Sequence, residues 1–183
     1  MNEQARKIVH LSFGAAISAA ILLLPAGQAE MILAAGLVAG LALAELVRAG
    51  YRVPLVSSLV DRLEREGEFP GKGAAYFVAS ALACTVFFPP AVAAAGVLSL
   101  SVLDAVSALA GRAFGRVRIW GAKTLEGSLA GIAANTAVLS LIIGPGTAFL
   151  VSVVAGTVEL LAPVDDNLLV PPAACTCLSL LPP

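Results

Sequence analysis

Charged side chains are scarce in this sequence, at 13% of 183 residues, whereas ordinary soluble domains carry about a quarter. Aromatic residues make up only 5%, and His10 is the single histidine. Because 59% of the residues are hydrophobic, a soluble globule of this size is excluded: its few polar residues could not cover its surface. The three cysteines lie in apolar runs, and their odd number argues against a disulfide framework.

Several motifs of soluble enzymes are also missing. The chain has neither a G-x-x-x-x-G-K-[ST] phosphate loop nor a G-x-G-x-x-G turn after a strand. It has no Cys/His metal cluster and no nucleophile elbow. These absences exclude the common soluble nucleotide sites, zinc sites and serine hydrolases. The net charge of −1 gives no sign of a nucleic-acid partner, and we expect none.

What the sequence does contain is a series of apolar runs, each close to the length of about 20 residues that a helix needs to cross a bilayer. They predict an all-α, polytopic membrane bundle of six or seven transmembrane helices. The predicted spans cover about residues 8–24, 29–48, 73–88, 90–111, 125–143, 146–162 and 167–181. The last run is short and contains Pro171 and Pro172, so we expect it to be kinked, re-entrant or only half crossing.

The polar segment 49–72 predicts one further helix, lying along the membrane interface. Its apolar residues recur at helical spacing opposite charged ones. No linker or internal repeat divides the chain.

Basic residues are confined to every second loop of this predicted topology. The turns "PAGQA", "FFPP" and "IIGPG" contain none. All eleven lie on the other side: Arg6, Lys7, Arg48, Arg52, Arg62, Arg65, Lys72, Arg112, Arg116, Arg118 and Lys123. The positive-inside rule therefore predicts an integral protein of the cell membrane whose N-terminus is cytoplasmic.

Four carboxylates lie inside predicted spans or at their ends, toward the cytoplasmic side: Glu45, Asp104, Glu126 and Glu159. Asp165 and Asp166 follow in a loop at the same level. A carboxylate at membrane depth is costly unless it is paired or binds something. Structural ion pairs would explain single cases. Carboxylates beside so many bases also suit a complex of Mg²⁺ with phosphate, because Mg²⁺ prefers one or two carboxylates plus phosphate oxygens.

Two motifs add detail to this polar region. Helical spacing places Asp104, Ser107 and Gly111 on one face, where small residues allow a helix or a ligand to approach. In "KTLEGS", Thr124 is predicted to cap a helix whose first turn contains Glu126. Free N–H groups at that helix start, with Lys123 just before them, would suit a phosphate.

Five segments in order carry a resemblance to a known family: "RKIVHLSFG", "GKGAAY", "DAVSALAGRAFGR", "KTLEGSLAG" and "VELLAPVDDNLLVP". Together they resemble the CTP-dependent lipid-alcohol kinases, which include dolichol kinase, phytol kinase and the CTP-using diacylglycerol kinase. The resemblance implies one transmembrane kinase domain over residues 1–183. It would transfer the γ-phosphate of CTP to the hydroxyl of a membrane lipid alcohol, with an active site facing the cytoplasm.

The resemblance and the chemistry of the residues together suggest roles for individual residues. Metal-binding carboxylates would be Asp104 and Glu126, with Asp165 or Asp166 on a second ion or the lipid hydroxyl. The family's recurring polar positions further include Gly111 and Asn167. Phosphates would be held by basic residues: Arg6, Lys7, Lys72, Arg116 and Lys123. Catalysis itself is expected to depend on Asp104, Lys123, Glu126 and Asp166, with Mg²⁺ as cofactor.

Two alternatives stay open. The pattern "D..A...GR.FG" followed by "KT.EGS.AG" also resembles the CDP-diacylglycerol synthases, which transfer a cytidylyl group to phosphatidic acid. The chain lacks the basic, glycine-rich ending of those enzymes, which favours the kinase. Outside enzymes, a small ion-coupled carrier would also use buried acids, although nearer the bilayer midplane. The alcohol, the choice of CTP over ATP and any homo-oligomer are left open.

Overall fold

The computed structural model describes residues 3–25, 27–63, 69–162 and 164–181. Within this part, eight helices follow one another: α1 (Glu3–Leu23), α2 (Gln28–Arg48), α3 (Val56–Leu63), α4 (Lys72–Phe87), α5 (Pro90–Phe114), α6 (Leu125–Ile143), α7 (Pro145–Leu161) and α8 (Asp166–Leu180). The predicted all-α class is confirmed, and each predicted span coincides with a helix whose ends differ by a few residues. The predicted interfacial helix corresponds to α3, while residues 64–68 lie outside the described part.

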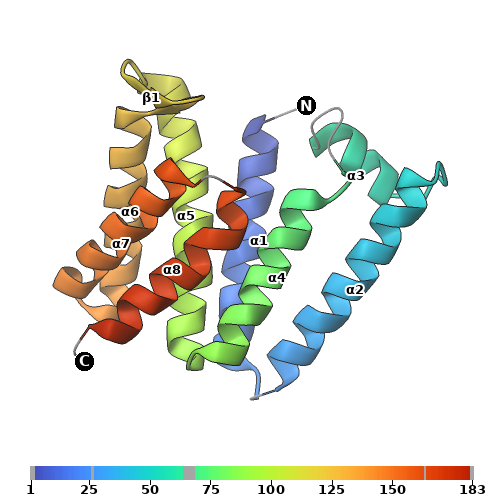
Figure 1. Cartoon of the computed structure of the whole chain (residues 1–183), viewed down its shortest axis with the longest axis horizontal. Coiled ribbons are helices and arrows are strands. Elements are labelled where there is room, and N and C mark those ends of the chain that lie inside the picture. Colours follow the sequence, from blue (N-terminus) through green and yellow to red (C-terminus); the bar gives the residue numbers. More distant parts are fainter. Residues whose placement is uncertain (1–2, 26, 64–68, 163, 182–183) are drawn as a thin grey trace.

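Helix α5 is the centre of the bundle. It packs against α1, α4, α6, α7 and α8, and 61% of its apolar 18-residue stretch is buried. Helix α2 is peripheral: it packs mainly against α4, and only 11% of its apolar stretch is buried. Figure 1 shows this arrangement, with α2 standing apart at one side. Apolar surface that no helix covers is expected where lipid replaces water as the surroundings.

Four helices are long and apolar enough to cross a membrane: α1, α2, α5 and α6. They indicate an integral membrane protein, but the predicted count of six or seven spans is larger. The difference lies in length, because α4 has 16 residues, α7 has 17 and α8 has 15. At 1.5 Å per residue these helices are about 22–26 Å long, less than the hydrocarbon core of about 30 Å.

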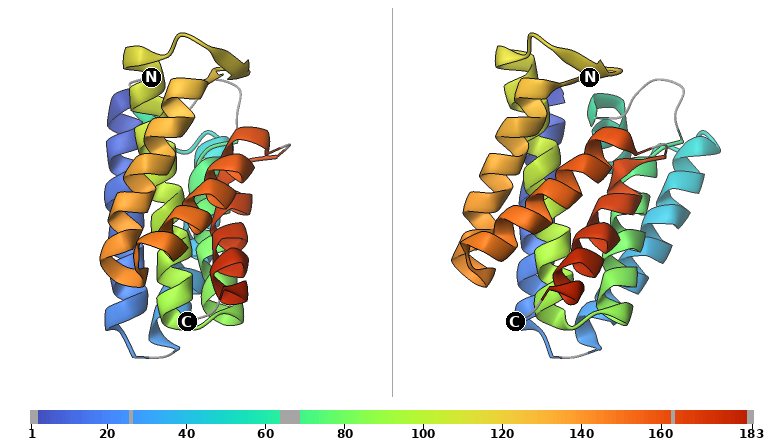
Figure 2. Two further views of the ribbon diagram at one scale, coloured as in Figure 1. Left: turned by 90° about the vertical axis from the view of Figure 1, so that its left-hand side faces the viewer. Right: turned by 60° about the vertical axis from the view of Figure 1, so that its left-hand side comes forward.

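The two ends of the bundle differ in charge. The N-terminus, α3 and the segment between α5 and α6 lie at one end, and the α1–α2 and α4–α5 turns lie at the other (Figures 1 and 2). Basic residues in the described helices lie at the first of these ends, at the start of α1 and α4 and in the last turn of α2 and α5. We call this the basic end.

The segment between α5 and α6 contains a small β-hairpin, which the sequence analysis did not predict. Strands β1 (Arg118–Trp120) and β2 (Lys123–Thr124) pair antiparallel. Strands this short carry no periodic signal, so sequence patterning could not reveal them. The hairpin leads directly into α6 and thereby positions Lys123 at the basic end.

Helix α8 continues through Pro171 and Pro172. Proline has no N–H, so Pro172 leaves the Leu168 carbonyl, four residues earlier, without its helical donor. The Ser80 hydroxyl of α4 donates to that carbonyl at 3.1 Å. The neighbouring helix thus satisfies the backbone, which keeps the start of α8 helical beside the basic end.

Candidate functional site

A polar cavity of about 980 Å³ opens at the basic end, between α1, α4, α5, the hairpin and the start of α8. Its lining is rich in charge, unlike the remainder of this apolar bundle. Six basic residues line it: Arg6, Lys7, Lys72, Arg112, Arg118 and Lys123. Five acidic residues also line it: Glu3, Asp104, Glu159, Asp165 and Asp166. Because the numbers of basic and acidic residues are nearly equal, the cavity can bind an anion together with a cation that accompanies it.

One cluster of charge joins α1 to α5. Lys7 donates to Asp104 in a buried ion pair, and both residues are less than one tenth exposed. His10 lies one turn further along α1, with its Nε2 at 3.9 Å from the Asp104 carboxylate. The His10 ring also packs against Phe77, at 4.7 Å between centroids. We call Lys7, His10 and Asp104 the Lys7 cluster.

A second cluster joins the hairpin to α7 and α8. Lys123 Nζ lies 2.8 Å from Glu159 Oε1 and 3.1 Å from Asp166 Oδ2. It also donates to the backbone carbonyl of Glu159. We call Lys123, Glu159 and Asp166 the Lys123 cluster. Burial opposes the charge of Lys123, yet the nearby carboxylates of Asp166 and Glu159 raise its pKa above the ordinary value.

The start of α8 contributes two more polar side chains. Asp165 caps the helix by accepting from the backbone N–H of Asn167 at 3.1 Å, and from its side-chain amide at 2.6 Å. This geometry occupies one Asp165 oxygen and fixes the Asn167 amide. The side-chain carbonyl oxygen of Asn167 takes no part in this cap and has no hydrogen-bond partner among the described residues.

Unsatisfied polar atoms concentrate at the cavity. In the described part of the chain, seven buried side-chain atoms lack a hydrogen-bond partner. Five of them belong to residues that line the cavity: Arg6 Nε, His10 Nε2, Ser107 Oγ, Glu159 Oε2 and Asn167 Oδ1. Buried polar groups are normally paired, and each that is not costs about 1–3 kcal/mol. Their concentration at one place points to a ligand that would pair them.

Glycines bring α5 and α6 together behind this cavity. A Cβ at Gly127 would lie 2.5 Å from the Ser107 carbonyl, and one at Gly131 would lie 2.1 Å from its hydroxyl. A Cβ at Gly111 would lie 2.8 Å from the Thr124 hydroxyl. Close helix packing, as in G-x-x-x-G pairs, therefore accounts for Gly111, and it fixes Lys123 relative to Asp104.

Glu126, by contrast, does not line the cavity. Thr124 caps α6 by accepting from Gly127 N at 3.2 Å, and Glu126 lies in the first turn, so both of these predictions are confirmed. The Glu126 carboxylate accepts from the backbone N–H groups of Arg116 at 3.0 Å and Val117 at 3.2 Å. It thus holds the hairpin, while Asp104 lies in the cavity with Lys123.

The cavity gathers nine of the eleven residues that the sequence suggested: Arg6, Lys7, Lys72, Asp104, Gly111, Lys123, Asp165, Asp166 and Asn167. Glu126 and Arg116 are not among its lining residues. Lys72 also lies over the Tyr76 ring, at 5.7 Å from its centroid. Glu45, another acid predicted at the polar level, lies elsewhere on the surface, in an exposed pair with Arg48 at 2.8 Å.

Sequence reasoning proposed no phosphate- or metal-binding role for several other residues of the cavity, among them His10, Arg112 and Arg118. His10 had a usable signal, because Glu3, Lys7 and His10 fall at helical spacing on one face. Arg118 had none, since its position depends on the unpredicted hairpin.

The described residues include no group of three or more His, Cys, Asp or Glu side chains that could hold a metal ion. One or two carboxylates at a time remain, which is the number that Mg²⁺ commonly takes from a protein when phosphates supply the other ligands.

No family model, curated protein or solved structure matches the chain.

Proposed function

We propose that the chain is a CTP-dependent kinase that transfers the γ-phosphate to the hydroxyl of a membrane lipid alcohol. The observation that supports this most is the polar cavity at one end of an apolar bundle, lined by six bases and five acids. A triphosphate needs several cations, and a lipid hydroxyl needs a polar site at the membrane boundary. The cavity offers both in one place.

Basic residues from three elements would hold the phosphates. Arg6 of α1, Lys72 of α4 and Lys123 of β2 line different walls of the cavity. Because the transition state of phosphoryl transfer is loose, positioning and charge neutralisation supply most of the catalysis. Cations that converge from several sides suit that requirement.

Mg²⁺ would accompany the nucleotide and neutralise the charge of its phosphates. Asp104 and Asp166, with the unpartnered Oε2 of Glu159, are the carboxylate groups of the cavity that fit it. Glu126 would act indirectly, by holding the hairpin that carries Lys123. A carboxylate of the Lys123 cluster would accept the proton of the lipid hydroxyl as its oxygen bonds to the γ-phosphorus. The bond between the γ-phosphorus and the bridging oxygen of the β-phosphate would break in the same step, and CDP would leave.

The orientation in the membrane follows from the same features. The positive-inside rule supports an orientation with the basic end, the N-terminus and the cavity on the cytoplasmic side, where CTP is available. The shorter apolar helices α4 and α7 would add two spans to the four long ones, with the bilayer thinned locally around them, and α8 would cross only in part.

The experiment uses purified chain in vesicles with Mg²⁺, a long-chain alcohol or phosphatidic acid, and CTP labelled at either the α or the γ position. Label from the γ position in the alcohol is the expected result. Label from the α position in phosphatidic acid would instead identify a cytidylyltransferase. No transfer from either label, together with ion flux across the vesicle membrane, would identify a carrier.

A further inference from the structure

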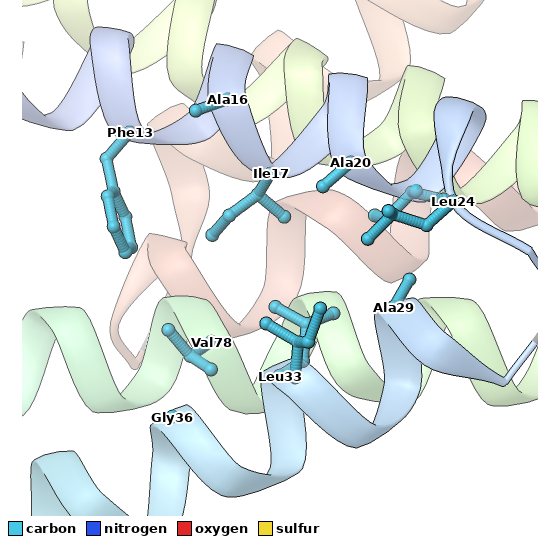
Figure 3. Close-up of a pocket in the computed structure, with 11 residues that line it drawn as sticks. Phe13, Ala16, Ile17, Ala20, Leu24, Ala29, Leu33, Gly36 and Val78 are labelled. Atoms are coloured by element: carbon cyan, nitrogen blue, oxygen red, sulfur yellow. The ribbon is translucent and has the colours of Figure 1, made fainter.

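A second cavity, entirely different in character, lies beside the polar one. It has a volume of about 290 Å³, and all of its lining residues are apolar or glycine. They come from α1, α2 and α4, and Figure 3 shows them along the length of the groove between α1 and α2. We call it the apolar groove.

The groove exists because two consecutive helices diverge. Helix α1 packs against α5, whereas α2 packs against α4, so α1 and α2 are held by different partners. Small residues then leave the space between them open, notably Ala16 and Ala20 on α1 and Gly36 on α2. Figure 3 shows Ile17 of α1 and Leu33 of α2 reaching toward each other across it. Larger residues at the small positions would have closed the gap.

The groove and the polar cavity meet at Phe13, which lines both. On α4, the successive residues Phe77 and Val78 line the polar cavity and the groove respectively. The Phe77 ring also packs against the ring of His10, a member of the Lys7 cluster. The polar cavity and the apolar groove thus adjoin each other at Phe13, and the change in character takes place over one turn of α1.

We propose that the apolar groove holds the hydrocarbon tail of the acceptor lipid and directs its hydroxyl past Phe13 into the polar cavity. This inference rests on the proposed kinase function and adds where the acceptor binds. The chemistry of the two linings indicates the occupant. An apolar groove next to a charged cavity fits a molecule that has a long apolar part and one polar end. The groove runs along α1 from Phe13 to Leu24, a length of about 16 Å at 1.5 Å per residue.

Two glycines of α2 provide a matched pair of variants. Gly36 lines the groove and Gly40, one turn further, does not. A Cβ at either position would meet no atom within 4 Å, so neither backbone position is closed to a side chain. Gly36→Phe should fill the groove, and Gly40→Phe should leave it open while changing helix propensity and hydrophobicity equally.

The test measures transfer from γ-labelled CTP to single-chain alcohols of increasing length. With the unmodified chain and with Gly40→Phe, kcat/KM should rise with tail length up to about 16 Å of chain and then level off. With Gly36→Phe the rise should be lost, lowering kcat/KM for long alcohols by about tenfold or more, since each buried CH₂ contributes roughly fourfold. Equal behaviour of the two variants, both folded by thermal melting, would overturn the groove assignment.

A second readout does not depend on transfer. A long-chain alcohol with a diazirine in its tail is photoactivated in vesicles, and the labelled residues are mapped by mass spectrometry. Labels on the facing sides of α1 and α2, competed by unmodified alcohol and absent in Gly36→Phe, are expected. Such labels without any transfer would preserve the groove and reject the kinase. Transfer with labels spread evenly over the outer helices would preserve the kinase and reject the groove.

Discussion

The Lys7 cluster and the Lys123 cluster line the same cavity but balance their charges differently. In the first, one lysine meets one carboxylate, and the buried pair is neutral. In the second, one lysine serves two carboxylates, and Glu159 Oε2 still has no hydrogen-bond partner. The comparison suggests a division of work. The neutral Lys7–Asp104 pair can link α1 to α5 without a ligand. The Lys123 cluster has surplus negative charge, which a further cation or a proton would neutralise.

The largest effect is expected where the neutral pair is broken. Asp104→Asn leaves Lys7 buried without a counter-charge, which should lower the free energy of unfolding by about 3–5 kcal/mol. Adding Lys7→Met should recover much of this loss, because no buried charge then remains. Thermal melting of the single and double variants in detergent measures the coupling. A single variant that melts like the original chain would mean that the pair does not link the helices.

The Asp104→Asn variant also tests whether Asp104 takes part in phosphoryl transfer. If it helps to hold Mg²⁺, the folded fraction of Asp104→Asn should be inactive in transfer, beyond its loss of stability. Normal activity in that fraction would reduce Asp104 to a structural partner of Lys7.

Breaking the Lys123 cluster should affect transfer more than stability. Lys123→Met removes the cation that the two carboxylates share, and a lost group of this kind typically lowers kcat by about 10²–10³-fold. Stability should fall as well, because Glu159, whose side chain is only 5% exposed, loses its counter-charge, but transfer should fall further. Arg48→Met, which disrupts an exposed pair that does not line the cavity, is the matched control and should be nearly silent. Equal losses in both variants would indicate a general charge effect.

Glu126→Gln sharpens the comparison by testing a carboxylate outside both clusters. Since Glu126 binds the backbone of the hairpin, its loss should loosen the hairpin and reduce transfer less than Lys123→Met does. Hydrogen exchange at residues 116–120 should accelerate. A loss of activity as large as that of Lys123→Met, with an unchanged hairpin, would restore the sequence-based view of Glu126 as a metal ligand.

The smallest effect concerns alkaline pH. Burial lowers the pKa of Lys123, but the carboxylates of Asp166 and Glu159 raise it by more. Folding therefore favours the charged form of Lys123. That contribution is complete below the ordinary lysine pKa of about 10.4 and disappears as pH rises through the higher folded value. The melting temperature of the original chain should therefore fall more steeply in this range than that of Lys123→Met. Parallel curves would contradict the ion pairing.

Much of the fold could be predicted because helix positions depend on local patterns. Apolar runs located the helices, and the cap at Thr124 followed from residue type and spacing. The Lys7–Asp104 pair could not be predicted in this way, since it joins residues 97 positions apart and depends on which helices pack. The hairpin that turns Glu126 away from the cavity is also a product of tertiary structure. Residue chemistry indicated that a polar site exists, and packing decided which groups face it.

The central claim is that the cavity at the basic end binds a nucleoside triphosphate with Mg²⁺. The most direct measurement is the melting temperature of the purified chain with CTP and Mg²⁺ together, and with each alone. Together they should stabilise the chain by about 2.7 kcal/mol at a hundredfold excess over Kd, and neither alone should match this. Lys123→Met should lose the stabilisation and Arg48→Met should keep it. No stabilisation by CTP at any Mg²⁺ concentration, or the same stabilisation in Lys123→Met, would contradict the claim.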